Sequence, residues 1–452
     1  MGRNVVLVCL DSVRKDVFDD VAVRVQNAAD VSVDGCRAAS SWSTPSHESM
    51  ISGLLAHEHG VHTHSRSFAS LPRERTVFAD LPEYRTVGAS SNVYAGPEYD
   101  FDRYFDEFFP LGRGIRFPEA VDPYSSERSL DEYRAYALAC LRNGKPVRSL
   151  CNGALELLDS VSDRLAWLFD EGARPGLEVV RRELASTERP TFAFVNLMEA
   201  HIPYRPARYL DDDLYDCPRG WSSAERDVWE LFSAEYDERY WDRRNGLYRA
   251  AVDYLDRCLS QFLEELDGAT TVVVTADHGD NLGTEADEGL ANHKSSLSEG
   301  LLHVPLHLIN PPEVSEPTGR YLSHLSLPDL IRGIRDGRIE DLTSDRAFAE
   351  LAGMSAGPDP DADHEYYDRA IRCAYDGDRK VVWDSLGTCT GYDLSGEANV
   401  QRASGSLARP PSWATRRFGR DISAFKHDAV KAGTDVSVDP STAARLRNLG
   451  YL

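Results

Sequence analysis

Lysine is scarce in this chain. Only six of its 452 residues are lysine, although Lys and Arg together number 50, and the 74 acidic residues leave a net charge of −24. Carboxylates bind water strongly and arginine is less hydrated than lysine, so such a surface suits a salt-rich medium that screens its self-repulsion. We therefore expect a halophilic host; an ordinary acidic protein of a GC-rich bacterium is the alternative. The acidity also argues against nucleic acid as a partner, because phosphates would be repelled.

Long apolar runs and paired cysteines are missing as well. No segment approaches the roughly 18 consecutive apolar residues of a membrane span. Met1 leads directly into a short apolar run, so we expect no signal peptide, no transmembrane segment and a cytoplasmic location. The eight cysteines are scattered and include no Cys-x-x-Cys pair. This favours reduced, mostly buried thiols over disulfides or a zinc knuckle.

Short apolar runs followed by polar residues recur along the chain. They predict buried strands over residues 4–10, 86–92, 192–197, 270–275 and 304–309. Helical patterns cover residues 45–54 and 248–266. This alternation predicts an α/β sandwich with a mostly parallel central sheet flanked by helices. Side chains that follow parallel strands gather at one edge of the sheet. The residues in such places are Asp11, Asn92, Glu199, His201, Asp277 and His278.

The composition and the predicted secondary structure of the chain change at two places. Residues 117–244 contain a helical, charged insertion followed by a segment rich in Asp, Tyr, Trp and Arg, which we expect to cap the site. After about residue 344, short strand patterns alternate with Gly- and Asp-rich turns. We therefore divide the chain into a main α/β domain over residues 1–343, with the cap inserted in it, and a small antiparallel C-terminal subdomain over residues 344–452.

Asp11, Asp277 and His278 are the candidate metal ligands. A carboxylate that ends a buried strand must be paired or metal-bound, and a carboxylate beside an imidazole suits a divalent cation. The alternatives are that Asp11 caps a helix beginning at Ser12 and that Asp277 and His278 belong to a solvated turn at Gly279.

Ser43 and Thr44 compete for the role of nucleophile. A hydroxyl bound to a cation at the start of a helix loses its proton more easily. The alternative is that they only cap the helix, where Ser and Thr are preferred. His47 follows one turn later and is expected to point into the same pocket. His201 and the pair His293-Lys294 add cations or proton donors, because a rare lysine beside a histidine suggests an anion contact.

These motifs resemble those of the sulfatase and alkaline-phosphatase superfamily, in particular its archaeal and bacterial sulfatase-like branch. The resemblance covers residues 3 to about 335 and, more weakly, the C-terminal subdomain. Its motifs are the strand that ends at Asp11, the segment from Trp42 to Gly53, the His-x-Pro loop at His201, the Asp277-His278-Gly279 turn, and the segment from His293 to Pro305. The resemblance implies an alkaline-phosphatase-like fold.

Position by position, the resemblance assigns Ser43 the place of the nucleophile. Asp11, Asp277 and His278, together with Ser43, take the places of metal ligands. Catalytic or substrate-anion places are implied for His47, His201, His293 or Lys294, and Arg14. From their places at a strand end and beside Ser43, we also expect Asn92 and Thr44 to contact the substrate.

Two positions depart from the family pattern. His47 stands where the formylglycine motif of sulfatases has arginine, which favours a direct hydroxyl nucleophile. Ser12 replaces the second of two tandem aspartates, which favours a single Mg²⁺, Ca²⁺ or Mn²⁺ over a bimetallic zinc centre.

The sequence thus predicts a metal-dependent hydrolase of sulfate or phosphate esters, with a small molecule or glycan as substrate. Transfer of the group to a sugar or lipid acceptor is one alternative, and a binding protein that has lost catalysis is another.

Overall fold

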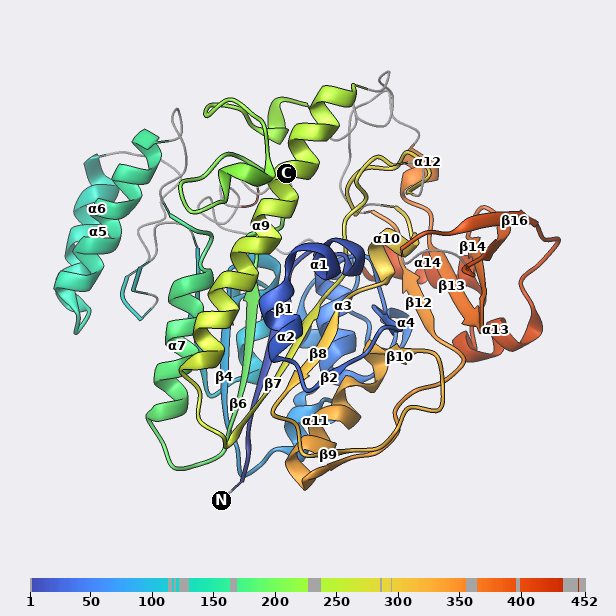
Figure 1. The fold of residues 1–452 in the computed structure, drawn as a ribbon, viewed down its shortest axis with the longest axis horizontal. Coiled ribbons are helices and arrows are strands. Elements are labelled where there is room, and N and C mark those ends of the chain that lie inside the picture. Colours follow the sequence, from blue (N-terminus) through green and yellow to red (C-terminus); the bar gives the residue numbers. More distant parts are fainter. Residues whose placement is uncertain are drawn as a thin grey trace.

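A seven-stranded sheet forms the centre of the computed structural model (Figure 1). Its strand order is β2-β8-β7-β1-β6-β4-β5, and all its strands run parallel except β8, which is antiparallel to both neighbours. The strands are β1 (Asn4–Leu10), β2 (Val31–Ser32), β4 (Arg85–Ser90), β5 (Glu107–Pro110), β6 (Thr191–Leu197), β7 (Thr270–Ala276) and β8 (Leu306–Ile309). The structure describes residues 2–112, 116–117, 119–121, 130–162, 169–226, 237–284, 287–293, 295–354, 364–395, 399–433 and 446.

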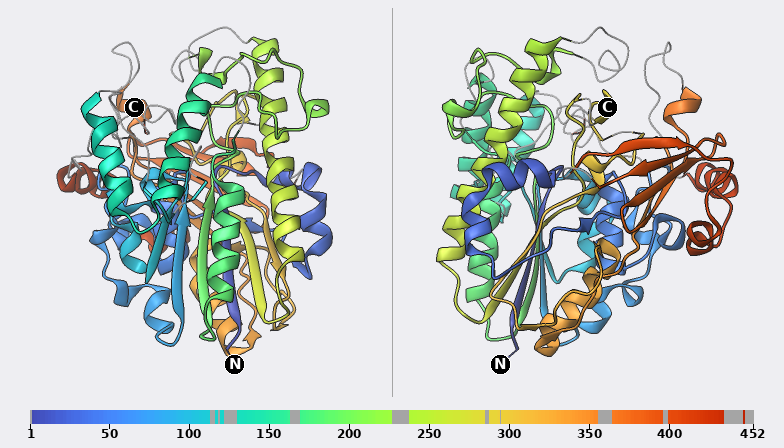
Figure 2. Two further views of the ribbon diagram at one scale, coloured as in Figure 1. Left: turned by 90° about the vertical axis from the view of Figure 1, so that its left-hand side faces the viewer. Right: turned by 45° about the vertical axis from the view of Figure 1, so that its right-hand side comes forward.

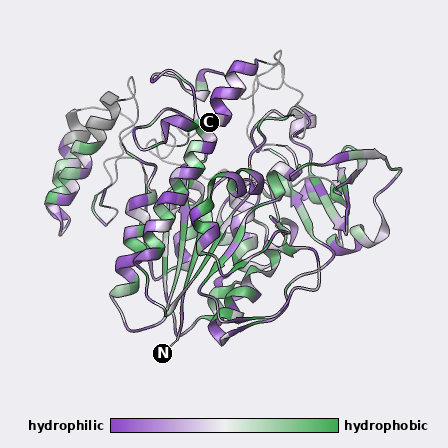
Figure 3. Ribbon diagram, in the orientation of Figure 1, coloured by the Kyte–Doolittle hydropathy of each residue, from purple (hydrophilic) through white to green (hydrophobic). Residues whose placement is uncertain are grey.

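Helices cover both faces of this sheet, as the edge-on view in Figure 2 shows. One layer consists of α1 (Lys15–Val21), α2 (Val23–Ala28), α7 (Ala173–Ala185) and α9 (Glu238–Glu264). The opposite layer consists of α3 (Ser43–Ser52), α4 (Ala56–His59) and α11 (Leu327–Asp336). The predicted α/β sandwich is confirmed. The central strands are mostly apolar because both faces are covered, and Figure 3 shows them as largely hydrophobic.

Two helices begin earlier than the sequence pattern predicts. Helix α3 begins at Ser43 because Ser43 and Thr44 adopt helical geometry ahead of Pro45, which is well tolerated in a first turn. Helix α9 begins at Glu238, ten residues before the predicted start at Tyr248. Its N-terminus is capped by Asp237, whose carboxylate accepts a hydrogen bond from the Tyr240 amide.

A second sheet of five antiparallel strands lies beside the first, as predicted for the C-terminal part. It consists of β12 (Phe348–Leu351), β13 (Ile371–Asp376), β14 (Arg379–Asp384), β15 (Cys389–Asp393) and β16 (Arg402–Ser406). Helices α13 (Ser412–Phe418) and α14 (Ile422–Ala432) pack on it through Phe418 and Phe425, in an apolar cluster that Leu55 of the main part joins. The remaining short elements are β3 (Cys36–Arg37), β9 (Glu313–Val314), β10 (Leu322–Ser323), β11 (Arg338–Ile339), α10 (Glu299–Leu302) and α12 (His364–Tyr367).

The predicted cap is described only in part. Helices α5 (Leu130–Arg142) and α6 (Pro146–Ser162) pack against each other, to one side of the sheet in Figure 1. Helix α7, which lies within the predicted insertion, packs on β4 and β6 and so belongs to the layer that covers the sheet. Among the described residues, no helix combines the length and the apolar character that a bilayer crossing requires.

Candidate active site

Strand register brings two distant acidic residues together. Leu10 pairs with Ala276 on one side and with Leu197 on the other, so the next residues, Asp11 and Asp277, emerge side by side at the carboxyl edge of the sheet. Both side chains are fully buried. Ligand atoms of Asp11, Asp277 and His278 all lie within 4.8 Å of one another. The three predicted metal ligands therefore form a single buried group, which we call the acidic site.

The oxygens of Asp277 are unequally satisfied. Its Oδ1 accepts hydrogen bonds from the backbone amides of Ser12 (3.1 Å) and His278 (2.9 Å). Its Oδ2 has no hydrogen-bond donor in the part of the chain that the structure describes. Burial and the neighbouring charge of Asp11 raise the pKa of Asp277 to about 7. An unsatisfied, fully buried carboxylate oxygen beside a second carboxylate and an imidazole fits a divalent cation.

Backbone contacts set the orientation of His278. Its Nδ1 lies 2.7 Å from the carbonyl oxygen of Gly279, which can only accept, so Nδ1 carries the proton. The lone pair is therefore on Nε2, which lies 3.5 Å from Asp277 Oδ2. Gly279 is needed in this turn because a side chain there would collide with the carbonyl oxygen of Gly300.

Ser43, and not Thr44, contacts this group. The Ser43 hydroxyl lies 3.3 Å from His278 Nε2. The Thr44 hydroxyl is buried and forms no hydrogen bond with any described residue. Trp42 is the residue that precedes the helix, and no side chain caps it. The capping alternative therefore has no support, and Ser43 points to the edge where both carboxylates emerge.

Asp11 is held by amides. Asn92 donates to its Oδ2 at 2.8 Å, Asn196 donates to the same oxygen at 3.3 Å, and the Ser12 hydroxyl donates to Oδ1 at 3.0 Å. Burial works to raise the pKa of Asp11, but the nearby His201 and the Asn92 amide help to hold it below its usual range. Asn92 thus orients a carboxylate, and its predicted contact with substrate stays a prediction. The Ser12 hydroxyl also orients this carboxylate.

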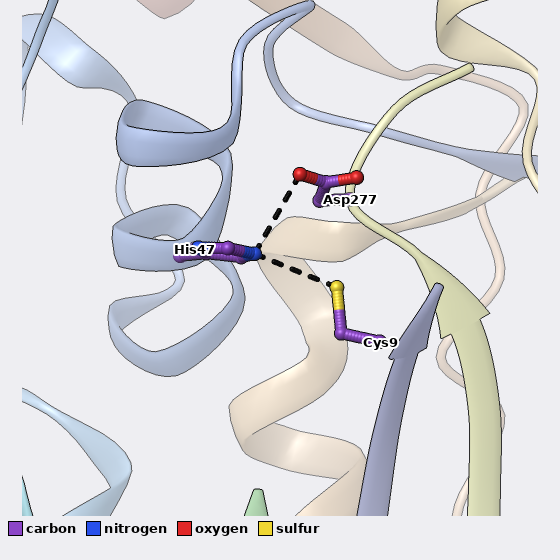
Figure 4. A group of neighbouring side chains, drawn as sticks. All are labelled: Cys9, His47 and Asp277. Atoms are coloured by element: carbon purple, nitrogen blue, oxygen red, sulfur yellow. Dashed lines mark hydrogen bonds and ion pairs between the residues drawn. The ribbon is translucent and has the colours of Figure 1, made fainter. Parts of the chain in front are cut away.

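His47 lies behind the carboxylates. Its Nε2 is 3.6 Å from Asp277 Oδ2, 3.5 Å from the sulfur of Cys9 and 3.4 Å from Asn196 Nδ2, and Figure 4 shows the first two contacts converging on that nitrogen. Burial lowers the pKa of His47 to about 4. The ring is fully buried, so these contacts favour a place beneath the acidic site over the predicted contact with a substrate anion.

Two further histidines line the other side of the acidic site. The ring of His293 lies 4.7 Å from that of His278 and 5.4 Å from that of His201, measured between centroids. Burial is the main cause that lowers the pKa of both His201 and His293, to about 3 for His293. His201 Nδ1 donates to the carbonyl oxygen of Ile202 at 2.6 Å, which leaves the lone pair on Nε2. Lys294 lies outside the described residues.

Arg14 has a different set of contacts from the one predicted. Its guanidinium donates to Asp16 and Asp287 and to the carbonyl oxygen of Asp280, at 2.7–3.1 Å. Only 3% of its side chain is exposed. With acidic partners on both sides, Arg14 fixes the loop after Gly279 in place, and these contacts favour a structural role over substrate binding.

Several residues around the site were not predicted from the sequence. Asn196 interrupts an apolar strand one residue before its end, and that polar interruption was a usable signal. Asp280 forms a buried ion pair with Arg244 at 2.7 Å and accepts a hydrogen bond from Tyr204. No sequence pattern marked this pair, because Arg244 comes from the distant helix α9.

Comparisons with known proteins agree with this geometry. The family model described as Sulfatase matches residues 3–331. A search of curated proteins found no significant match. Among the similar solved structures is a putative sulfatase from Bacteroides thetaiotaomicron, with 13% identity, a TM-score of 0.56, and coverage of 98% of this chain and 96% of that one.

Two more solved structures have a similar fold. A phosphonate monoester hydrolase of Agrobacterium radiobacter has 14% identity and a TM-score of 0.58, with 95% of each chain covered. A protein solved in complex with its substrate D-glucosamine-2-N,6-O-disulfate has 13% identity and a TM-score of 0.57, with 97% of this chain and all of that chain covered. At these identities the likeness concerns the fold.

Proposed function

The chain belongs to the sulfatase family, and from that premise we propose that it hydrolyses sulfate or phosphate esters with Ser43 as nucleophile and a divalent cation as cofactor. The observation that supports this most strongly is the convergence of the Ser43 hydroxyl with Asp11, Asp277 and His278 in one buried group. These residues come from three separate parts of the chain, and a purely structural cluster would not require an unsatisfied carboxylate oxygen.

The proposed cofactor would be held by Asp11, Asp277 and His278. A divalent cation there would lower the pKa of a nearby hydroxyl and offset the negative charge of the ester oxygens. The chain itself supports such a cation by leaving Asp277 Oδ2 without a donor and by holding the His278 proton on Nδ1. Asn92 and Asn196 keep Asp11 turned towards the same place.

In the proposed reaction, Ser43 Oγ attacks the sulfur or phosphorus atom. A bond forms from Oγ to that atom and the bond to the leaving oxygen breaks, so that Ser43 carries the sulfuryl or phosphoryl group and the alcohol departs. The alcohol oxygen takes up the proton that Ser43 Oγ gives up, and the neutral rings of His201 and His293 are the candidates to carry that proton between the two oxygens. Water then attacks the seryl ester, releases sulfate or phosphate, and restores the Ser43 hydroxyl.

The class of substrate follows from the family and from charge. The site holds several histidines beside two carboxylates, and a cation in the acidic site would make it attractive to an anionic ester. We propose a small-molecule or glycan ester. The similar structures include a protein solved with a disulfated glucosamine and a phosphonate monoester hydrolase, so both sulfur and phosphorus esters belong in the test.

A substrate panel tests the proposal directly. Aryl sulfates, phosphate monoesters and phosphate diesters are assayed at high salt with Mg²⁺, Mn²⁺, Ca²⁺ or Zn²⁺, each with and without an added alcohol. Release of free sulfate or phosphate supports a hydrolase. Conversion of the added alcohol to a new ester identifies a transferase. Absence of turnover with every ester, in protein that neither binds nor contains a metal, supports a non-catalytic binding protein.

A further inference from the structure

Cys9, His47 and Asp277 form a second group of potential metal ligands beside the acidic site. Their sulfur, imidazole nitrogen and carboxylate oxygen lie within 4.8 Å of one another, and all three side chains are fully buried. Cys9 lies in β1 and Asp11 directly follows that strand, two positions further on, so the two side chains are expected on the same side of the sheet. Figure 4 shows the three residues meeting at His47 Nε2, from the ends of two strands and from helix α3.

We propose that this group, which we call the thiol site, binds a second metal ion and prefers a thiophilic one such as Zn²⁺. Zinc bonds to sulfur at about 2.3 Å and to nitrogen or oxygen at about 2.0–2.2 Å, so adjacent donors in a tetrahedral site lie about 3.3–3.6 Å apart. Cys9 Sγ lies 3.5 Å from His47 Nε2, and that nitrogen lies 3.6 Å from Asp277 Oδ2. Two of the three donor pairs therefore already have the spacing of a zinc site.

Unsatisfied buried atoms point to the same place. Asp277 Oδ2 has no hydrogen-bond donor among the described residues, and neither Nδ1 of His47 nor Oδ1 of Asn196 has a partner there. The Asn196 amide nitrogen lies 3.8 Å from Cys9 Sγ and 3.4 Å from His47 Nε2.

Charge and chemistry distinguish the two sites. Metal binding at the thiol site displaces the proton of Cys9, so the sulfur binds as a thiolate and one proton goes to the solvent. Mg²⁺ and Ca²⁺ prefer oxygen donors and would bind only at the acidic site. Asp277 Oδ2 faces His278 in one site and His47 in the other, and would bridge two ions at the spacing of about 3.5–4 Å known for paired metals.

Cobalt titration of the full-length, metal-stripped protein tests this proposal without an activity assay. Co²⁺ bound to a thiolate gives an intense sulfur-to-metal charge-transfer absorption. We expect this absorption and two bound ions in the native protein. Cys9→Ser should abolish the absorption and retain one ion. The matched control is Cys36→Ser, which alters another fully buried cysteine and should change neither result.

The outcomes separate this proposal from the proposed reaction. A missing charge-transfer absorption in folded native protein, or one that survives Cys9→Ser, overturns the thiol site whether or not the protein hydrolyses esters. If Cys9→Ser does not fold, X-ray absorption of the zinc-loaded native protein decides. One sulfur neighbour at about 2.3 Å supports the thiol site, and a shell of nitrogen and oxygen alone overturns it.

Discussion

The Ser43 hydroxyl lies 3.3 Å from Nε2 of His278, although 235 positions of the chain separate the two residues. The contact joins the first turn of α3 to the turn that follows β7. It places the proposed nucleophile against one of the three proposed metal ligands. The most direct predictions concern these residues.

Replacing Ser43 by Ala should lower kcat by on the order of 10³-fold or more, because no other described hydroxyl contacts His278. The comparison is Thr44→Ala, whose hydroxyl lies apart from this contact and whose loss should cost far less activity. Ser52→Ala, in the last position of the same helix, controls for general damage. A fully active Ser43→Ala protein, or a larger loss from Thr44→Ala, would transfer the role to Thr44 or end the proposed mechanism.

Asp277→Asn should remove the metal before it disturbs the fold, because Asp277 supplies the unsatisfied oxygen of the acidic site. Elemental analysis and calorimetric titration with Mn²⁺ measure the loss, and circular dichroism checks the fold. Loss of a ligand carboxylate should weaken Mn²⁺ binding by on the order of 100-fold. Asp242→Asn, on the exposed side of α9, should bind Mn²⁺ as the native protein does. Equal metal content in both variants would exclude Asp277 as a ligand.

The buried His59 should make the folded protein less stable in mild acid. Its Nδ1 accepts a hydrogen bond from the Val61 amide, and burial lowers its pKa from 6.5 to about 3. Below pH 6.5 the unfolded chain therefore binds a proton that the folded protein does not, so the free energy of unfolding falls as the pH falls from about 6.5 towards 3.

Urea denaturation of the native protein and of His59→Gln measures this effect. Between about pH 7.5 and pH 5, the native protein should lose about 2 kcal/mol more than the variant. His427→Gln, at an exposed position, is the control and should follow the native protein. Identical pH dependence in all three proteins would show that His59 does not contribute.

The buried Lys380 should anchor the C-terminal sheet to the main α/β part of the protein. Its ammonium group is fully buried and lies 2.8 Å from Glu299, which also pairs with Arg37 at 2.9 Å. Removing one partner from such a group leaves a buried charge underpaired, so Lys380→Met should destabilise the protein by about 3–5 kcal/mol. Denaturation with urea measures the change, with Lys431→Met at an exposed position as the control. A loss below about 1 kcal/mol would contradict this account.

The net charge of −24 predicts stability that depends on salt. At about 0.1 M salt the screening length is about 10 Å, so the acidic surface repels itself, and at about 1 M it falls to about 3 Å. The Tm in KCl should therefore rise by at least several degrees over this range. A Tm that is already maximal in dilute buffer would argue against a halophilic host.

Local sequence was sufficient for five of the seven strands of the central sheet and for the position of the acidic site. The apolar runs predicted β1, β4, β6, β7 and β8 to within about two residues, because strands buried on both faces are mostly apolar. The polar residues that end these runs had to gather at one edge of a parallel sheet. Asp11, Asp277 and His278 do meet there.

The partners of individual side chains were decided by the tertiary structure alone. Arg14 and Asn92 follow strands just as a ligand would, yet one binds Asp16 and Asp287 and the other orients Asp11. Cys9 gave no signal, because an apolar strand tolerates a thiol like any small apolar side chain. Its place beside His47 and Asp277 depends on how β1 pairs with β7 and on where α3 packs. Such long-range packing depends on the whole fold, which no local stretch of sequence encodes.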